Sequence, residues 1–281
     1  MKYAFSTLGL PGTPLARGAA LAAEHGFGAI ELRAHPEEPL HPDSTSADRA
    51  AGLRTLTTAG VTVLGVAGYV QVAAAGPDEP VLAAVRALVR LAHDLRAPYV
   101  RVFPGGGNLP EADADALAVR RLRAGAPFAA RHGVRILLET HDSHRTATAA
   151  ARVLDRVGHP GAGALWDVLH TWLGGESPAE SRRALAGHLG YIQVKDVASA
   201  RDLTPLGLGA GVLPLAAAVT AAPRDGWLCW EYEKRWYPGA ADLPGQLARG
   251  RAYLEELASS TTATGQAERT HRRSGSRDEA E

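Results

Sequence analysis

The stretch Val134–Asp167, "VRILLETHDSHRTATAAARVLDRVGHPGAGALWD", contains one copy of the pattern that decides the fold. It opens with the apolar run Val134–Glu139 and closes with a second such run, Gly163–Asp167, and the residue types of both favour β-strands. Between them, Arg145–Val157 has apolar residues at helical spacing. A strand, a helix and another strand in this order predict a right-handed βαβ unit and a parallel sheet.

The same alternation extends along the chain. Eight β-favouring runs are, in order, "YAFSTL", "GAIELR", "VTVLGV", "YVRVF", "VRILLE", "GALWD", "YIQVK" and "WLCWE". Further segments with helical spacing are Leu82–Leu95, Ala112–His132, Ala179–Leu189 and Ala241–Leu257. Eight such repeats predict an α/β fold, a single (β/α)8 TIM barrel, which needs about 250 residues. A doubly wound sheet is the alternative, but "STLGLPGTP" after the first strand has no G-x-G-x-x-G turn.

The barrel is expected to span residues 1–258. Residues 259–281 are polar and have no apolar period, so they predict a disordered tail. The glycine-rich "GLGAG", Gly207–Gly211, precedes an apolar stretch instead of following a strand, so it predicts a tight loop and no phosphate cradle.

Composition excludes several function classes. The 281 residues carry zero formal net charge, which argues against a nucleic-acid partner, and no apolar run is long enough to cross a membrane. Cys229 is the only cysteine, so no internal disulfide can form. Met1–Pro11 has no signal-peptide pattern, and we therefore expect a cytoplasmic protein.

Four of the late strands end on polar side chains. They are Glu139, Asp167, Gln193 and Glu231. Since the working residues of a (β/α)8 barrel lie at the carboxyl ends of its strands, we expect these four to meet on one rim. Asp167 alone has an ordinary explanation as a turn or helix cap. Three carboxylates at one end of a barrel repel one another, however. A divalent cation with a preference for oxygen ligands relieves that repulsion.

These pieces resemble the xylose isomerase-like (β/α)8 superfamily of sugar isomerases and epimerases, over nearly all of Met1–Leu257. The matching motifs are "AIEL", "LLETH", "DVLH", "QVKD", "LGLGAGVLPL" and "WEYE", in this order along the chain. The resemblance implies that a divalent metal is held by Glu139, Asp167, Gln193 and Glu231. It also implies that His170 contacts substrate oxygens.

Gln193 departs from the superfamily, which usually has histidine there. An amide oxygen coordinates a hard cation weakly and carries no titratable proton, so we expect an all-oxygen site that favours Mn²⁺ or Mg²⁺. The same departure leaves marginal metal binding open.

The chemistry expected of such a metal site is proton transfer at a carbon beside a carbonyl group. A metal acts as a Lewis acid while a base removes the proton, and the resemblance also points to Glu139 and Glu231 as the base and acid. Return of the proton to the opposite face gives an epimer, and return to the adjacent carbon gives an aldose–ketose isomer. Loss of a β-hydroxyl from the same enediolate gives an inosose-type dehydratase instead.

Two further residues are candidates for substrate contact. Glu31 on the second strand either binds substrate or pairs with Arg33 or Arg101. His141 shares the face of Glu139 if its strand continues that far, so it either supports the metal ligands or belongs to a loop.

Lys195 is the third candidate. It is one of three lysines in the chain and contacts either substrate and carboxylates or only its neighbour Asp196 at the surface. Four tryptophans are expected near the rim, where some wall the pocket and others join the core. They are Trp166, Trp172, Trp230 and Trp236.

We therefore expect a metal-dependent sugar isomerase or epimerase with a small-molecule sugar substrate and possible homo-oligomers. A DNA-repair enzyme of the endonuclease IV branch would need a histidine-rich zinc site and a basic groove, which Gln193 and the neutral charge disfavour. A third hypothesis is a non-catalytic sugar-binding protein that keeps the barrel fold as a relic, and Gln193 is its best support.

Overall fold

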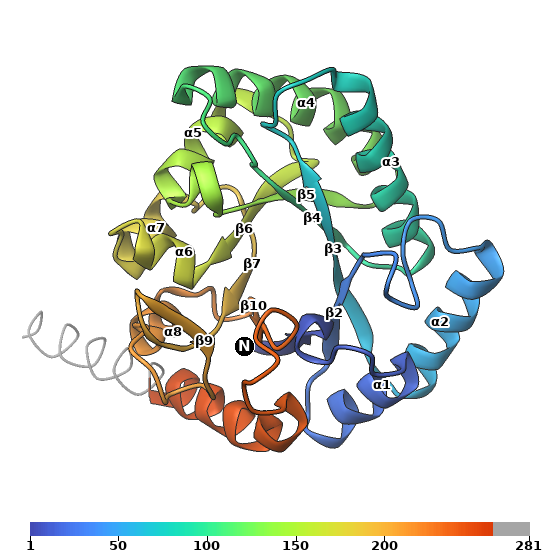
Figure 1. Ribbon diagram of the computed structural model, residues 1–281, viewed down its shortest axis with the longest axis vertical. Helices are drawn as coiled ribbons and strands as arrows, with labels where there is room; N and C mark the ends of the chain where they lie inside the picture. The colour runs from blue at the N-terminus through green and yellow to red at the C-terminus, as the bar shows by residue number, and fades with distance from the viewer. Residues whose placement is uncertain (261–281) are drawn as a thin grey trace, which may run out of the picture.

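The computed structural model describes residues 1–260 and contains a closed barrel of eight parallel strands, as predicted (Figure 1). Around the barrel the strand order is β1-β10-β7-β6-β5-β4-β3-β2. The bounds of these strands are β1 Lys2–Ser6, β2 Ala29–Arg33, β3 Thr62–Gln71, β4 Tyr99–Phe103, β5 Arg135–Glu139, β6 Ala162–Asp167, β7 Leu189–Val194 and β10 Trp227–Trp230.

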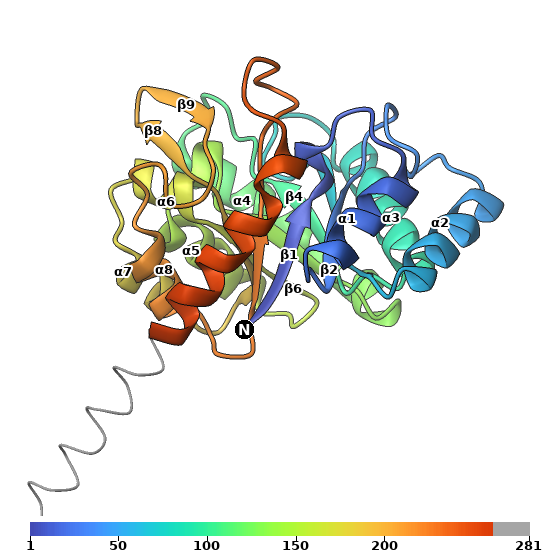
Figure 2. The same cartoon turned by 90° about the horizontal axis from the view of Figure 1, so that it is seen from below.

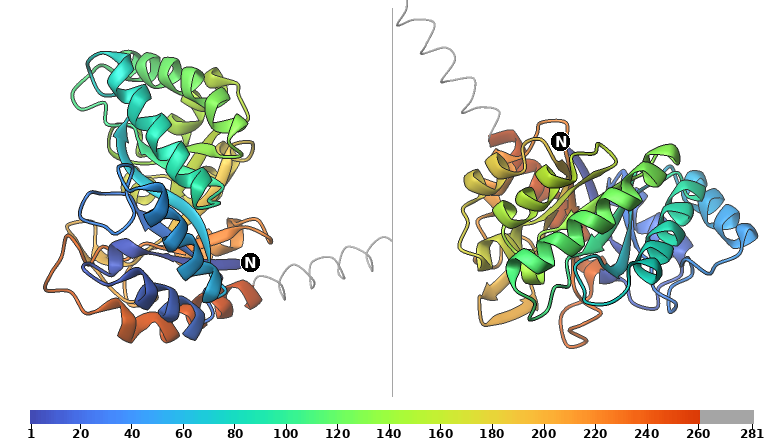
Figure 3. Two further views of the ribbon diagram at one scale, coloured as in Figure 1. Left: turned by 90° about the vertical axis from the view of Figure 1, so that its right-hand side faces the viewer. Right: turned by 90° about the horizontal axis from the view of Figure 1, so that it is seen from above.

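Helices form an outer layer around the strands, visible from two further sides in Figure 3. They are α1 Leu15–Glu24, α2 Ser46–Thr58, α3 Asp78–Asp94, α4 Glu111–Arg131, α5 Ala147–Val157, α6 Val168–Leu173, α7 Pro178–Ala184, α8 Leu215–Ala221 and a last helix over 247–260. Short 3₁₀ turns occur at η1 Thr7–Gly9, η2 Asp142–His144 and η3 Leu243–Gln246. Within the described residues, none of the helices has the length and apolar character needed to cross a bilayer.

The structure differs from the predictions at several places. The helix predicted at Ala179–Leu189 ends at Ala184, because Leu189 already begins β7. A small antiparallel hairpin, β8 Val197–Ser199 with β9 Asp202–Pro205, was not predicted because strands of three and four residues are too short to show an alternating apolar pattern. The last helix includes residues 259 and 260, and the rest of the predicted tail lies outside the described residues.

Strand alternation produces two separate apolar layers. Side chains that point outward pack between the strands and the helices, and Trp166 and Trp230 lie fully buried in this layer. Both were expected near the rim, but each precedes an inward-facing carboxylate by one residue and so faces the other way. Trp236 is 51% exposed and remains the tryptophan available to the mouth.

Side chains that point inward fill the barrel with a small apolar cluster. It consists of Ala4, Ala29, Leu64, Leu137, Leu165, Tyr191 and Cys229. Six of these lie two residues before a polar side chain on the same strand or just past its end: Ala4 before Ser6, Ala29 before Glu31, Leu137 before Glu139, Leu165 before Asp167, Tyr191 before Gln193, and Cys229 before Glu231. Because residues i and i+2 share a face, the polar set forms the next layer toward the carboxyl ends of the strands.

The carboxyl ends of the strands carry the longer loops. In Figure 2, β1 rises from the N-terminus, and the hairpin β8–β9 and the orange-red loop after β10 project beyond the strands at the opposite end. We call this end the mouth of the barrel.

Candidate active site

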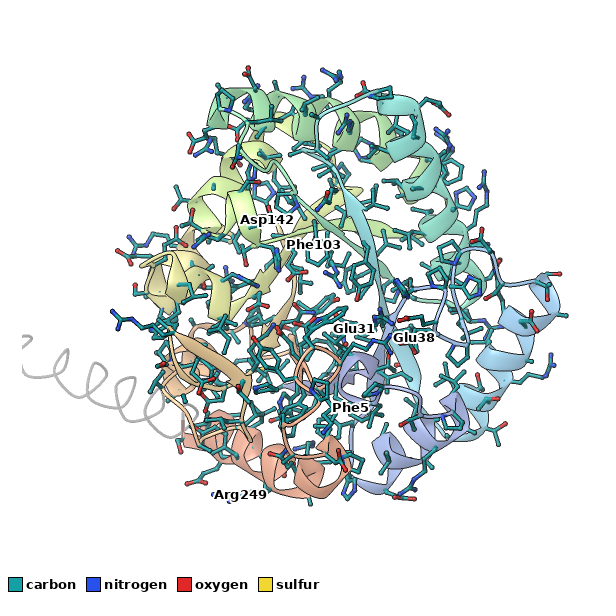
Figure 4. All side chains as sticks on the ribbon, viewed as in Figure 1. Phe5, Glu31, Glu38, Phe103, Asp142 and Arg249 are labelled. Carbon is teal, nitrogen blue, oxygen red and sulfur yellow. The ribbon has the colours of Figure 1, made fainter. Side chains whose placement is uncertain are left out.

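Six polar side chains meet just inside the mouth, and we call them the rim cluster. They are Glu31, Glu139, Asp167, Gln193, Lys195 and Glu231, and each is at most 4% exposed. The sequence predicted that the four strand-end residues share one rim, and the structure brings them together. Figure 4 labels Glu31 within the ring of strands, whereas Arg249 lies on the outer helical layer.

Glu31 is held by hydrogen bonds and not by an arginine. The hydroxyl of Tyr191 donates to its Oε2, and the amide nitrogen of Gln193 lies 3.0 Å from the same oxygen. The two arginines considered as its partners pair elsewhere, Arg101 with Glu139 at 3.0 Å and Arg33 with Glu38 at 2.7 Å.

The two oxygens of Asp167 have different surroundings. Its Oδ1 accepts the backbone N–H of Leu169 at 2.8 Å and that of His170 at 3.4 Å, so it caps the N-terminus of α6. Its Oδ2 takes no part in the cap and faces the rim cluster, where Lys195 Nζ lies 2.7 Å away.

Lys195 is 3% exposed and faces inward, so it does not form the surface pair with Asp196. Its ammonium donates to Glu231 Oε2 and, at 2.7 Å, to Glu233 Oε1. Burial alone would lower the pKa of Lys195, but the carboxylates of Asp167 and Glu231 raise that pKa well above its ordinary value.

Asp196 points the other way and organises the glycine-rich loop. Its Oδ2 accepts the backbone N–H groups of Gly209 at 3.0 Å and Gly211 at 2.9 Å, and its Oδ1 accepts that of Leu213 at 3.2 Å. Gly209 has a φ of +84°, which only glycine adopts easily. The loop thus uses its N–H groups on the chain's own carboxylate, in agreement with the prediction of a structural loop.

Three buried oxygens of the rim cluster have no hydrogen-bond donor. They are Glu139 Oε2, Asp167 Oδ2 and Gln193 Oε1. The guanidinium of Arg101 and the ammonium of Lys195 lie near the two carboxylate oxygens, but neither approach is directed as a hydrogen bond. Buried oxygens without donors are rare and costly, and a bound cation satisfies them.

The buried charges of the mouth do not balance. The four carboxylates of Glu31, Glu139, Asp167 and Glu231 face two buried cations, Arg101 and Lys195, which leaves two formal negative charges in excess. Burial raises the pKa of Glu139 to about 8, against the opposing effect of Arg101. Burial, reinforced by Glu231, also raises the pKa of Glu31.

Two histidines stand beside these carboxylates. His141, at the start of η2, and His170, in α6, have ring centroids 4.0 Å apart. Ligand atoms of Glu139, His141 and His170 all lie within 4.8 Å of one another, so these three could also hold a metal ion. Burial lowers the pKa of His170 to about 3, which keeps its imidazole neutral near pH 7.

An aromatic wall extends from the histidines around one side of the mouth. The ring of Phe103 lies 4.5 Å from His141 and 6.0 Å from Tyr69, centroid to centroid. Tyr69 accepts a hydrogen bond from Arg33 at 2.7 Å, and the Arg33 guanidinium lies 5.6 Å from the Trp236 ring. The mouth therefore offers flat apolar surfaces on one side and charged groups on the other.

Sequence reasoning missed two contributors and undervalued a third. Tyr191 and Glu233 were not singled out, and Arg101 was considered only as a partner of Glu31. Arg101 interrupts the apolar strand "YVRVF" at an inward position, which is a usable signal for a functional charge. Glu233 lies beyond the end of its strand, where alternation no longer predicts direction.

The residues present fit a divalent cation. Three of the four predicted ligands have an oxygen that accepts no well-directed hydrogen bond, and the fourth, Glu231, has both oxygens engaged, by Gln193 and Lys195. An ion at the predicted position must therefore compete with the ammonium of Lys195.

Comparisons with known proteins agree with this architecture. The family model described as "xylose isomerase-like TIM barrel" matches residues 19–257. A search of curated proteins found no significant match.

Solved structures share the fold at low sequence identity. A probable 3-DHS dehydratase, AsbF, from Bacillus anthracis is 18% identical, with a TM-score of 0.76 over 91% of this chain and 99% of that one. The IOLI protein with a bound zinc atom is 18% identical, with a TM-score of 0.77 over 93% and 99%. D-psicose 3-epimerase from Clostridium cellulolyticum H10, solved with D-tagatose, is 16% identical, with a TM-score of 0.77 over 93% and 99%.

Proposed function

The chain belongs to the xylose isomerase-like TIM barrel family, and from this premise we propose that it is a divalent-metal-dependent isomerase or epimerase. Its substrate is a keto or aldo sugar, or a related polyol, that reacts through an enediolate. The observation that carries the proposal is the set of buried oxygens on Glu139, Asp167 and Gln193 that accept no well-directed hydrogen bond, in a mouth where four carboxylates face two buried cations.

Glu139, Asp167, Gln193 and Glu231 would hold the ion. Carboxylate and amide oxygens suit Mn²⁺ or Mg²⁺, so these are the metals proposed. A bound ion supplies Lewis-acid stabilisation of the negative charge that develops on a substrate oxygen. The alternative set of Glu139, His141 and His170 has two imidazoles and would favour a metal such as zinc.

Glu139 and Glu231 are the proposed pair for proton transfer. Glu139 ends β5 and Glu231 directly follows β10, and β6 and β7 lie between these two strands in the barrel, so the two carboxyl groups approach a bound substrate from different directions. Burial raises the pKa of Glu139 to about 8, and a carboxylate with a raised pKa is a stronger base once ionised. The neutral imidazole of His170 would hydrogen-bond a substrate oxygen.

Dehydration is the second candidate, and Lys195 is the observation that favours it. Its ammonium lies among the same carboxylates and can donate a proton to a departing β-hydroxyl group. The leaving group would depart as water, and the enediolate would become an unsaturated ketone.

Deuterium exchange tests the proposal. Incubation with Mn²⁺ and a panel of keto-sugars and inososes in D₂O should place deuterium on a carbon beside the carbonyl, and the label should be absent with Glu139→Gln. Asp115→Asn is the matched control, because it changes an equally buried carboxylate outside the mouth and should still exchange.

The products separate the candidates. An isomerase or epimerase releases a labelled sugar of unchanged mass apart from deuterium, whereas a dehydratase releases a product lighter by one water that absorbs in the ultraviolet. A protein that binds sugars, carries no stoichiometric divalent ion and never exchanges a proton is the non-catalytic relic.

The cellular setting stays a prediction. A cytoplasmic location suits the single thiol of Cys229, which is buried and unpaired, and homo-oligomers are also proposed without a tested interface. No nucleic-acid partner is proposed, because the formal net charge is zero.

A further inference from the structure

Lys195 links two buried carboxylates of the rim cluster to a third carboxylate that lies closer to solvent. Its Nζ donates to Glu231 Oε2 and to Glu233 Oε1 and lies 2.7 Å from Asp167 Oδ2. Asp167 and Glu231 are buried among the proposed metal ligands, whereas the side chain of Glu233 is 21% exposed. One ammonium therefore contacts two proposed ligands and one carboxylate that is not a ligand.

The ammonium and a divalent ion need the same oxygens. Glu231 Oε1 accepts from Gln193 at 3.0 Å, so an ion must approach Glu231 through the oxygen that Lys195 holds, or displace Gln193. Asp167 Oδ2, which lies 2.7 Å from Lys195 Nζ, accepts no well-directed hydrogen bond. Because two cations at one set of oxygens repel, ion binding moves Lys195 off Asp167 and Glu231.

Glu233 is the partner that remains. Its hydrogen bond to Lys195 is 2.7 Å long and uses no proposed ligand atom. Its loop is fixed independently of Lys195: the Tyr232 hydroxyl donates to Ala241 O at 2.9 Å, and Lys234 Nζ lies 3.0 Å from Asp242 Oδ1. A displaced ammonium thus meets a carboxylate already held at the edge of the mouth.

We propose that Glu233 is a positioning residue that draws Lys195 away from the metal ligands and holds its ammonium at the substrate side of the mouth. The inference rests on the proposed metal site and deepens it. Glu233 makes room for the ion, and the same contact keeps the buried ammonium paired once the ion is bound.

A double-mutant cycle on Mn²⁺ affinity tests this, measured by calorimetry and by the EPR signal of free Mn²⁺. Glu233→Gln should weaken binding by about tenfold, as loss of a residue behind the ligands usually does, because Lys195 returns to Asp167 and Glu231. Lys195→Met should tighten binding, since it removes the competing cation, while it abolishes turnover. In the Lys195→Met background, Glu233→Gln should change Mn²⁺ affinity by less than twofold.

Asp242→Asn is the matched control. It removes the same charge from the same loop and from another lysine, and it should leave Mn²⁺ affinity unchanged. Should Lys195→Met fail to fold, Lys195→Gln provides the second background, because its amide can still hydrogen-bond to the carboxylates.

The outcomes separate the inference from the function on which it rests. Equal weakening by Glu233→Gln in both backgrounds would mean that Glu233 acts through its charge alone, which overturns the positioning role and leaves the metal site standing. Absence of Mn²⁺ binding to the unmodified chain would overturn the proposed function, and the inference with it.

Discussion

Two buried charge clusters in this protein differ in one decisive respect. Asp115, in α4, is 3% exposed, and both of its oxygens are paired. Its Oδ1 lies 3.0 Å from His144 Nε2, and its Oδ2 accepts from Arg152 at 2.7 Å with Arg156 a further 3.5 Å contact. The rim cluster is buried as deeply, yet three of its oxygens have no donor.

This difference shows that a buried charge does not by itself indicate a functional site. Around Asp115, one carboxylate faces two guanidinium groups and a histidine, so the cluster is complete and ties α4 to α5. In the mouth, four carboxylates face two cations, and the cluster is incomplete without a ligand. Incomplete satisfaction is the feature that points to function.

Glu139→Gln should have the largest effect. It removes both a base and a metal ligand, so turnover should fall by about 1,000-fold or more. The free energy of unfolding of the metal-free protein should stay the same or rise, because a buried carboxyl group with a raised pKa is replaced by a neutral amide. Steady-state kinetics measures the turnover, and urea melts measure the free energy of unfolding. A large loss of stability would contradict the distinction between the rim cluster and the Asp115 cluster.

Asp115→Asn should show the opposite pattern. Loss of the charge removes the ion pairs with Arg152 and His144, although Arg152 keeps Glu111 at 3.2 Å. It should cost roughly 2 kcal/mol of unfolding free energy, less than for a fully enclosed pair because Arg152 is partly exposed. Mn²⁺ affinity and turnover should be unchanged. A variant that melts normally but loses activity would show that the two clusters are not separate in role.

Gln193 offers a pair of substitutions with opposite expected signs. Gln193→Leu removes one unpaired oxygen and should weaken Mn²⁺ binding by about tenfold or more, whereas Gln193→His supplies a stronger ligand and should tighten it. Calorimetric titration of both variants measures the difference. Equal affinities would remove Gln193 from the ligand set.

The smallest effect is the pH dependence of the Asp115 cluster. Burial favours the protonated form of Asp115, but the hydrogen bonds from Arg152 and His144 outweigh it and lower the pKa. Its stabilising contribution is therefore complete above the unfolded-state pKa of about 4 and is lost as the pH falls through the lower folded-state value. Melts of the unmodified chain and Asp115→Asn should differ at pH 6 and converge toward pH 3.

The barrel was predictable because the same local pattern recurs along the chain: a short apolar, β-favouring run followed by a segment with helical spacing. β5 and β6 end at Glu139 and Asp167, as the runs Val134–Glu139 and Gly163–Asp167 predicted. The hairpin β8–β9 was not, because strands of three and four residues are too short to show an apolar period.

The alternation of inward and outward residues along the strands also predicted which side chains meet, but not which hydrogen bonds and ion pairs they form. Lys195 shares the inward face of Gln193, and Asp196 faces outward, so extending the alternation by two residues beyond Gln193 would have excluded their pairing. The contact between Lys195 and Glu233 joins two loops far apart in sequence, and no local pattern encodes it.

The most direct test is the anomalous scattering of Mn²⁺ in crystals of the unmodified protein. We expect a single strong peak in the mouth, ligated by oxygens of Glu139, Asp167, Gln193 and Glu231, with Lys195 moved toward Glu233. A peak on Glu139, His141 and His170 instead, or a mouth that stays empty at saturating Mn²⁺, would contradict the account.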